Sequence, residues 1–242
     1  MHYNKVTTET NTPDFLRFTA VSNIATICIG TERNLSNINN SIKYSFTGED
    51  NTWEDMSTDP IALSKFETIY LIGVNTEGFM DPGEYNTMSG FSSITDDYDD
   101  SYLTCKPFFK MTGRFIVNGN IMSIVDCTQE DGYDIPESVP VIKDNNDDEL
   151  GYFRAFFANT PNILTAPKLP ITLLRPYCYA YMFTGCTGLT ETPELPATDL
   201  NQGCYEGMFL KCSNIKTVHE LPATTFIGSK NPFYDVYIGM FS

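Results

Sequence analysis

The chain lacks several features that common functional classes require, beginning with long hydrophobic runs. No stretch of its 242 residues approaches the roughly 18 to 20 consecutive apolar residues of a membrane-spanning helix. Basic residues are also scarce, because 15 lysines and arginines stand against 31 acidic residues, for a net charge of −16. The cations form no stripe that could neutralise a run of phosphates. We therefore expect neither membrane insertion nor nucleic-acid binding.

Histidine is nearly absent, which restricts the catalytic chemistry. His2 stands in a polar N-terminal segment and His219 inside a repeat, where we interpret it as a tolerated surface substitution rather than a catalytic base. Neither phosphate-binding loops nor dinucleotide motifs are present. With 31 acidic residues some pair of carboxylates will always look suitable, so no single pair indicates a glycosidase. The sequence predicts a protein that is not an enzyme and binds no cofactor.

The seven cysteines cannot all pair within one chain. Four of them recur at matching repeat positions, as small buried apolar residues do in a ladder: Cys178, Cys186, Cys204 and Cys212. The spacing from Cys178 to Cys186 fits none of the Cys-x2-4-Cys patterns of structural zinc sites. Reduced thiols are the favoured interpretation and zinc the alternative.

The N-terminal part of the chain reads as β-structure. After a flexible arm at 1–14, residues 15–125 contain short alternating runs such as "FLRFTAV", "ATICIG" and "TIYLIGV", separated by polar turns. Runs rich in β-branched and aromatic residues with this alternation are typical of antiparallel strands. We predict a β-sandwich-like domain over 15–125.

An acidic linker or cap is expected at 126–151, where the stretch "DNNDDE" occurs. Its carboxylates make weak calcium candidates of Asp144, Asp147 and Asp148, because hard cations prefer several oxygens on a flexible loop. The stretch lacks the spaced D-x-[DN]-x-[DN]-G pattern. A solvated acidic loop is therefore favoured over a metal site.

Residues 152–242 repeat with a fixed period. "CYAYMFTGC" begins at Cys178 and "CYEGMFLKC" at Cys204, a step of 204 − 178 = 26 residues, and a degenerate copy begins at Tyr152. Each copy pairs apolar residues four apart, which predicts a short helix, before a proline-containing extended segment. The predicted repeat core consists of Met182, Phe183, Leu189, Leu195, Met208, Phe209, Ile215 and Leu221.

The pattern "CYxxMFxxCxxL" followed by "ELPAT" resembles the BspA-like leucine-rich repeat, and the upstream runs look like the β-domain that precedes such repeats in proteins of gut bacteria and their tailed bacteriophages. The resemblance implies an α+β fold. Its parts would be an N-terminal antiparallel β-sandwich-like domain and a short leucine-rich-repeat solenoid with a 26-residue period.

The resemblance also implies a non-enzymatic structural or interaction protein, a fibre, tail or capsid-associated component of a phage virion assembled in the host cytoplasm. Its expected partners are other virion proteins or a host-surface protein or glycan, within a homo-oligomer or larger assembly. The alternatives are a bacterial cell-surface adhesin of the same repeat family and a carbohydrate-binding module. We expect the binding surface where the copies differ and aromatic residues gather: Tyr181, Tyr205, His219, Phe233 and Tyr234.

Overall fold

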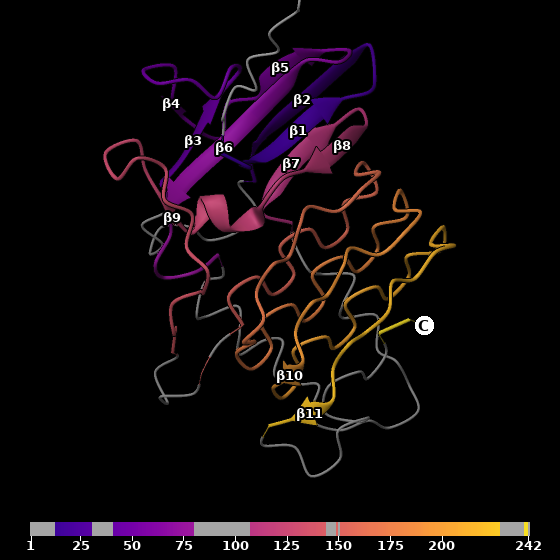
Figure 1. Ribbon diagram of the computed structural model, residues 1–242. Coiled ribbons are helices and arrows are strands. Elements are labelled where there is room, and N and C mark those ends of the chain that lie inside the picture. The colour runs from indigo at the N-terminus through magenta and orange to yellow at the C-terminus, as the bar shows by residue number, and fades with distance from the viewer. Residues whose placement is uncertain are drawn as a thin grey trace, which may run out of the picture.

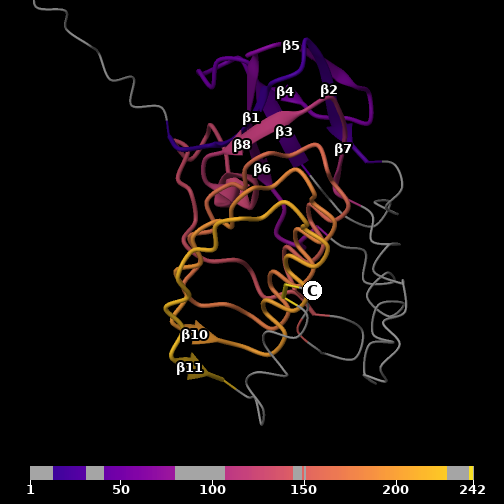
Figure 2. The same cartoon turned by 90° about the vertical axis from the view of Figure 1, so that its right-hand side faces the viewer.

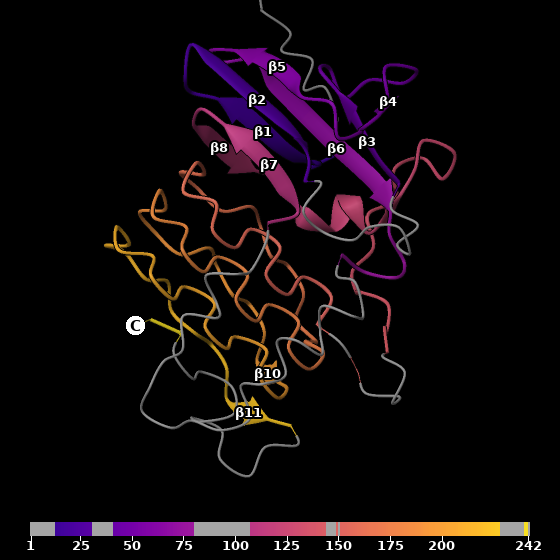
Figure 3. The same cartoon turned by 180° about the vertical axis from the view of Figure 1, so that it is seen from behind.

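Strands dominate the N-terminal half of the molecule and a series of tight turns the C-terminal half (Figure 1). The computed structural model describes residues 13–30, 41–79, 107–143, 149, 151–227 and 240–241. In three views related by quarter turns, the strands of the N-terminal half lie at one end, and the turns lie at the other with the short strands of residues 199–200 and 225–226 among them (Figure 1, Figure 2, Figure 3).

The larger sheet has the strand order β4-β3-β6-β1-β8, and β9 adds to β6. Every pair in it is antiparallel. A single turn of 3-10 helix, η4 (Ile121–Ile124), follows β8. The strands are β1 (Leu16–Ala20), β3 (Ser41–Ser45), β4 (Glu54–Asp55), β6 (Thr68–Val74), β8 (Phe115–Asn118) and β9 (Asp126–Cys127).

A smaller antiparallel sheet faces the larger one, with β2 (Ile24–Ile29) between β5 (Ile61–Ser64) and β7 (Phe109–Thr112). Alternation produces this packing, since side chains of successive strand residues point to opposite faces. Along β1 the residues Leu16, Phe18 and Ala20 are buried. Phe18 meets Phe109 of β7 edge to face, with ring centroids 5.3 Å apart. The two sheets therefore form a sandwich.

Residues 152–227 form three stacked units, which we call the turn stack: unit 1 (152–177), unit 2 (178–203) and unit 3 (204–227). Backbone groups join each unit to the next. Tyr179 N–H donates to Cys204 O at 3.0 Å and Phe183 N–H to Met208 O at 2.9 Å, while the intervening Met182 N–H donates to Tyr179 O within its own turn. Residues along the segment therefore alternate between hydrogen bonds to the next unit and hydrogen bonds within their own turn.

Backbone conformation in the turns repeats every four residues. The residue at each fourth position has a positive φ, which an α-helix cannot contain. These residues are Ala155, Asn159, Tyr177, Tyr181, Gly185, Gly203, Gly207 and Lys211.

Aromatic rings form columns through the stack. Phe157, Phe183, Phe209 and Phe241 lie face to face, with successive centroids 5.5, 5.7 and 5.4 Å apart. The 26-residue alignment of the first three, and the later step to Phe241, are confirmed by this column. The eight predicted repeat-core residues belong to one cluster, in which six are buried and Ile215 and Leu221 lie partly buried at its margin.

The sandwich and the turn stack share one hydrophobic core. The ring of Phe108 stacks on that of Phe156 in unit 1 at 5.1 Å, and Phe108 N–H donates to Phe156 O at 3.0 Å. Phe115 of β8 exchanges backbone hydrogen bonds with the first unit, donating to Asn162 O and accepting from Leu164 N–H. Unit 1 therefore continues the packing of the sandwich.

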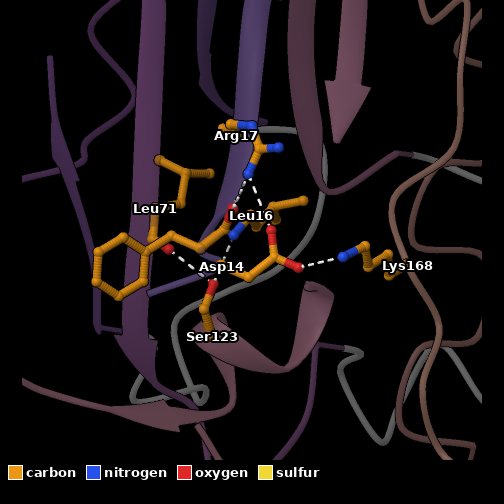
Figure 4. Close-up of polar contacts among 7 residues, drawn as sticks. Asp14, Leu16, Arg17, Leu71, Ser123 and Lys168 are labelled. Atoms are coloured by element: carbon orange, nitrogen blue, oxygen red, sulfur yellow. Dashed lines mark hydrogen bonds and ion pairs between the residues drawn. The ribbon is translucent and has the colours of Figure 1, made fainter. Parts of the chain in front are cut away.

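A polar joint strengthens this contact at the start of β1 (Figure 4). The Asp14 carboxylate accepts from Arg17 at 3.0 Å and from Lys168 of unit 1 at 2.6 Å. Partial burial raises the pKa of Asp14, but the hydrogen bonds and charges of Lys168 and Arg17 outweigh it and bring the pKa below its usual value of 3.8.

The same joint contains a buried hydroxyl (Figure 4). Leu16 N–H donates to Ser123 Oγ at 2.9 Å, and the Ser123 hydroxyl donates to Leu71 O at 2.8 Å. Ser123 therefore ties η4 to both β1 and β6.

The predicted α+β fold class with a leucine-rich-repeat solenoid is wrong. Within the described ranges the elements are eleven strands, most of them in antiparallel sheets, and one 3-10 turn, with no α-helix. The segment 178–186, predicted as a helix, is a run of turns because every fourth residue is left-handed. Isolated bridges and the two-residue parallel pair β10 (Asp199–Leu200) and β11 (Thr225–Phe226) join the units, so no continuous sheet closes the repeats into a solenoid.

Candidate interaction surface

Three strand connections meet at one end of the sandwich, which we call the sandwich tip (residues 20–24, 64–68 and 112–115). Backbone hydrogen bonds join them. Phe66 N–H donates to Ala20 O at 2.8 Å, and Val21 N–H donates to Arg114 O at 2.8 Å. Arg114 N–H in turn donates to Ser22 Oγ at 3.0 Å. These hydrogen bonds fix the three connections relative to one another.

Two apolar side chains protrude from the tip. Ile24 is 78% exposed and Phe66 is 72% exposed, the highest values among the large hydrophobic residues of the described chain. They lie on adjoining turns, since Ile24 is the β-partner of Ser64. Exposed apolar side chains that gather in a patch indicate a site for a partner.

The backbone holds Phe66 in an uncommon conformation. Its φ is +72°, a region that costs a non-glycine residue about 1–2 kcal/mol. Two neighbouring contacts maintain it, because Glu67 N–H donates to Ser64 O and the Glu67 carboxylate accepts from Ser64 N–H at 2.6 Å. Strained residues of this kind concentrate at functional surfaces.

The tip carries a local positive charge on a strongly acidic chain. Lys65 Nζ lies 5.0 Å from the centroid of the Phe66 ring, within cation–π distance. Arg114 is exposed on the neighbouring turn, and Glu67 is the one acidic residue of the three connections. Two cations against one carboxylate give the tip a charge of +1, whereas the whole chain carries −16.

The described residues that the sequence suggested as a binding surface do not belong to the tip. Tyr181 and Tyr205 are buried in the turn stack, and His219 is half-buried in unit 3. Phe233, Tyr234 and the calcium candidates Asp144, Asp147 and Asp148 lie outside the described residues.

Tyr181 takes part in a buried polar column. Its ring occupies the space above Gly207, where a Cβ would overlap it, and its hydroxyl donates to Glu206 Oε1 at 2.5 Å. The Arg154 guanidinium lies 5.7 Å from the ring centroid. Burial raises the pKa of Glu206, while the Tyr181 hydrogen bond and the charge of Arg154 act in the opposite direction. The column stabilises the stacking of the three units.

His219 also bonds to the neighbouring unit. Its backbone N–H donates to Thr192 Oγ1 at 2.9 Å, and its Nδ1 lies 2.6 Å from Thr192 O. Because a carbonyl can only accept, Nδ1 carries the proton in this arrangement. The side chain is thus held as a structural link between units 2 and 3.

The repeat cysteines are buried thiols. Burial raises the pKa values of Cys178, Cys204 and Cys212 to about 12 and that of Cys186 well above its usual value. Cys186 Sγ donates to Phe157 O, and the equivalent Cys212 Sγ to Phe183 O. A thiol of such high pKa is a poor nucleophile at neutral pH.

Two kinds of site have no candidate among the described residues. Their histidine, cysteine and acidic side chains form no group of three or more that could hold a metal ion. In that same part of the chain, none of the helical structure has the length and hydrophobicity to cross a membrane.

Comparison with known proteins gives no relative. Neither the protein-family models, nor the curated proteins, nor the solved structures include a significant match. The resemblance of the repeats to the BspA-like repeat therefore stays a prediction from the motif.

The sequence reasoning missed Ile24 and Phe66. Both residues are at the ends of runs that read as ordinary strands, "SNIATICIG" and "IALSKFETIYLIGV". The one available signal was "SKFE", where a phenylalanine between charged residues interrupts the alternation of the flanking strands.

Proposed function

We propose that this protein is a non-enzymatic interaction protein that binds a protein partner through the sandwich tip. The exposure of Ile24 and Phe66 on adjoining strand connections carries the proposal. Large apolar side chains at the centre of an interface supply most of its binding energy, and Phe66 is already fixed by its backbone contacts. A partner would therefore bury the ring at a small cost in conformational entropy.

The turn stack supports this proposal as a rigid extension of the sandwich. Its units share the sandwich core, and the joint at Asp14 and Lys168 fixes unit 1 to β1. A surface carried on such a body keeps its orientation, which is what a component of a larger assembly requires.

The narrower proposal is a component of a tailed-phage virion that contacts other virion proteins or a host surface. The likeness of the repeat motif supports it. A bacterial cell-surface adhesin is the alternative from the same likeness.

A photo-crosslinking residue placed at position 66 tests the function. Position 173 is the control, because Leu173 is also an exposed apolar residue, at 56%, but belongs to unit 1 and follows Lys168, whose bridge to Asn120 lies at the other end of β8 from the tip. In extracts of the producing cells, we expect crosslinks to a defined protein from position 66 only.

The purified partner then gives the quantitative test. Phe66→Ala should weaken binding at least about tenfold, equivalent to roughly 1.4 kcal/mol, and Leu173→Ala should not change it. Equal crosslinking at both positions, or none at either, would contradict the proposed function.

A further inference from the structure

A second surface has the opposite charge to the tip. It lies on the outer side of units 2 and 3 and comprises Glu191, Glu194, Val218 and Glu220, which we call the acidic face. The bridge between Glu191 and Thr217 sets the register of the two units, and the same register places Glu194 beside Glu220. All three carboxylates are exposed.

An apolar side chain lies among these carboxylates. Val218 is 55% exposed and follows Thr217, the partner of Glu191. The nearest cation along unit 3 is Lys216, whose N–H donates to Thr190 O. Three carboxylates and one cation give the face a charge of −2. It therefore complements the sandwich tip in both charge and hydrophobicity.

The two surfaces belong to different parts of the molecule, with unit 1 between β8 and the acidic face. Unit 1 is the unit that bonds to the sandwich, whereas the acidic face begins with unit 2 and ends in unit 3. Backbone hydrogen bonds join β8 to unit 1 and each unit to the next, so the tip is held in place and cannot move onto the acidic face of its own chain. Contact between them requires two molecules.

We propose that copies of this protein associate head to tail, with the sandwich tip of one copy docked on the acidic face of the next. Phe66 and Ile24 would cover Val218, and Lys65 and Arg114 would pair with Glu194 and Glu220. This inference rests on the proposed function, because it takes the tip as the binding surface and names its occupant.

The geometry of such a contact predicts how assembly depends on conditions. A contact between two different patches leaves one of each free on every complex, so molecules add until a ring closes or a filament grows. The charged pairs would lie at the rim, where salt screens them over about 8 Å at 0.15 M. We expect average mass to rise with protein concentration and to fall when sodium chloride is raised to about 1 M.

Sedimentation velocity of the full chain, from about 1 µM to about 1 mM, measures the association directly. Phe66→Ala should raise the apparent dissociation constant at least about tenfold, whereas the control Leu173→Ala should leave it unchanged. Circular dichroism of each variant shows that the fold is retained.

Exchanging one charge on each surface tests whether the acidic face is the surface that binds the tip. Lys65→Glu and Glu220→Lys should each weaken association, and the double variant should restore it toward the wild-type value, because the exchanged charges again attract. A double variant no better than the single variants would overturn the pairing.

Two outcomes separate this inference from the proposed function. A wild-type chain that stays monomeric to about 1 mM, yet crosslinks to a different protein from position 66, would overturn head-to-tail association and leave the proposed function in place. A monomer that also gives no specific crosslink from position 66 would contradict both.

Discussion

The column of phenylalanine rings makes a quantitative prediction about Phe183. This ring is fully buried and lies between Phe157 at 5.5 Å and Phe209 at 5.7 Å, with interplanar angles of 7° and 1°. Replacing it with alanine removes two ring contacts and leaves a cavity between units 1 and 3. Substitutions of this type cost about 3–5 kcal/mol, and we expect about 4 kcal/mol here.

Phe241 provides the matched control at the end of the same column. Among the described residues it stacks on one ring, that of Phe209 at 5.4 Å, and it is 47% exposed. Full burial of a phenylalanine stabilises a protein by about 1.5–3 kcal/mol, so losing this half-buried ring should cost about 1 kcal/mol.

Urea unfolding followed by circular dichroism measures both costs. With an m-value near 2 kcal/mol/M, Phe183→Ala should lower the midpoint by about 2 M and Phe241→Ala by about 0.5 M. Equal losses for the two variants, at unchanged m-values, would refute the idea that stacking between the units holds the repeats together.

Three further predictions concern the stack, the thiols and the joint. Gly188→Ala should lower the free energy of unfolding in urea by about 3 kcal/mol, because the added Cβ would overlap backbone oxygens of unit 1. The control Gly132→Ala should cost about 1 kcal/mol, because its Cβ would meet no atom within 4 Å and only the positive φ of Gly132 disfavours alanine. The thiols of Cys178, Cys204 and Cys212, whose pKa values are raised from 9.0 to about 12, should react with a thiol reagent at pH 8 about a thousandfold more slowly than after unfolding, as measured by mass spectrometry of the labelled peptides. Asp14→Asn should lower the free energy of unfolding by under about 1 kcal/mol at neutral pH, because the ion pairs of Asp14 with Arg17 and Lys168 are partly exposed. The difference in stability from wild type should shrink as the pH falls below 3.8, because the lowered pKa of Asp14 then ceases to favour the folded state.

The repeat period could be predicted from the sequence, but the local structure of each unit could not. A helix and a ribbon of four-residue turns both place residues four apart on one face, so Cys178, Met182 and Cys186 fit either one. The left-handed residues decide between them. Gly185 permits that conformation, but Tyr177 and Tyr181 carry no sequence signal for it.

The core that the sandwich and the turn stack share could not be predicted from the sequence either. Phe108 and Phe156 stack although they lie 156 − 108 = 48 residues apart in the sequence, and nothing in either local pattern indicates the partner. The predicted boundaries at 125 and 151 follow from composition, which does not report such contacts. The exposure of Phe66 was hidden for a related reason, because a single sequence shows hydrophobicity but not which face is covered.

The most direct test of one continuous body uses Trp53, the single tryptophan of the chain. It lies in the sandwich, with its ring 5.3 Å from Phe15 and its Nε1–H donating to the Tyr133 hydroxyl at 2.9 Å, while Phe183 lies in unit 2. In Phe183→Ala, the urea midpoint reported by Trp53 fluorescence should fall together with the midpoint from circular dichroism. A Trp53 midpoint that stays at the wild-type value while the circular dichroism transition splits would contradict the account, because the sandwich and the turn stack would then unfold as independent domains.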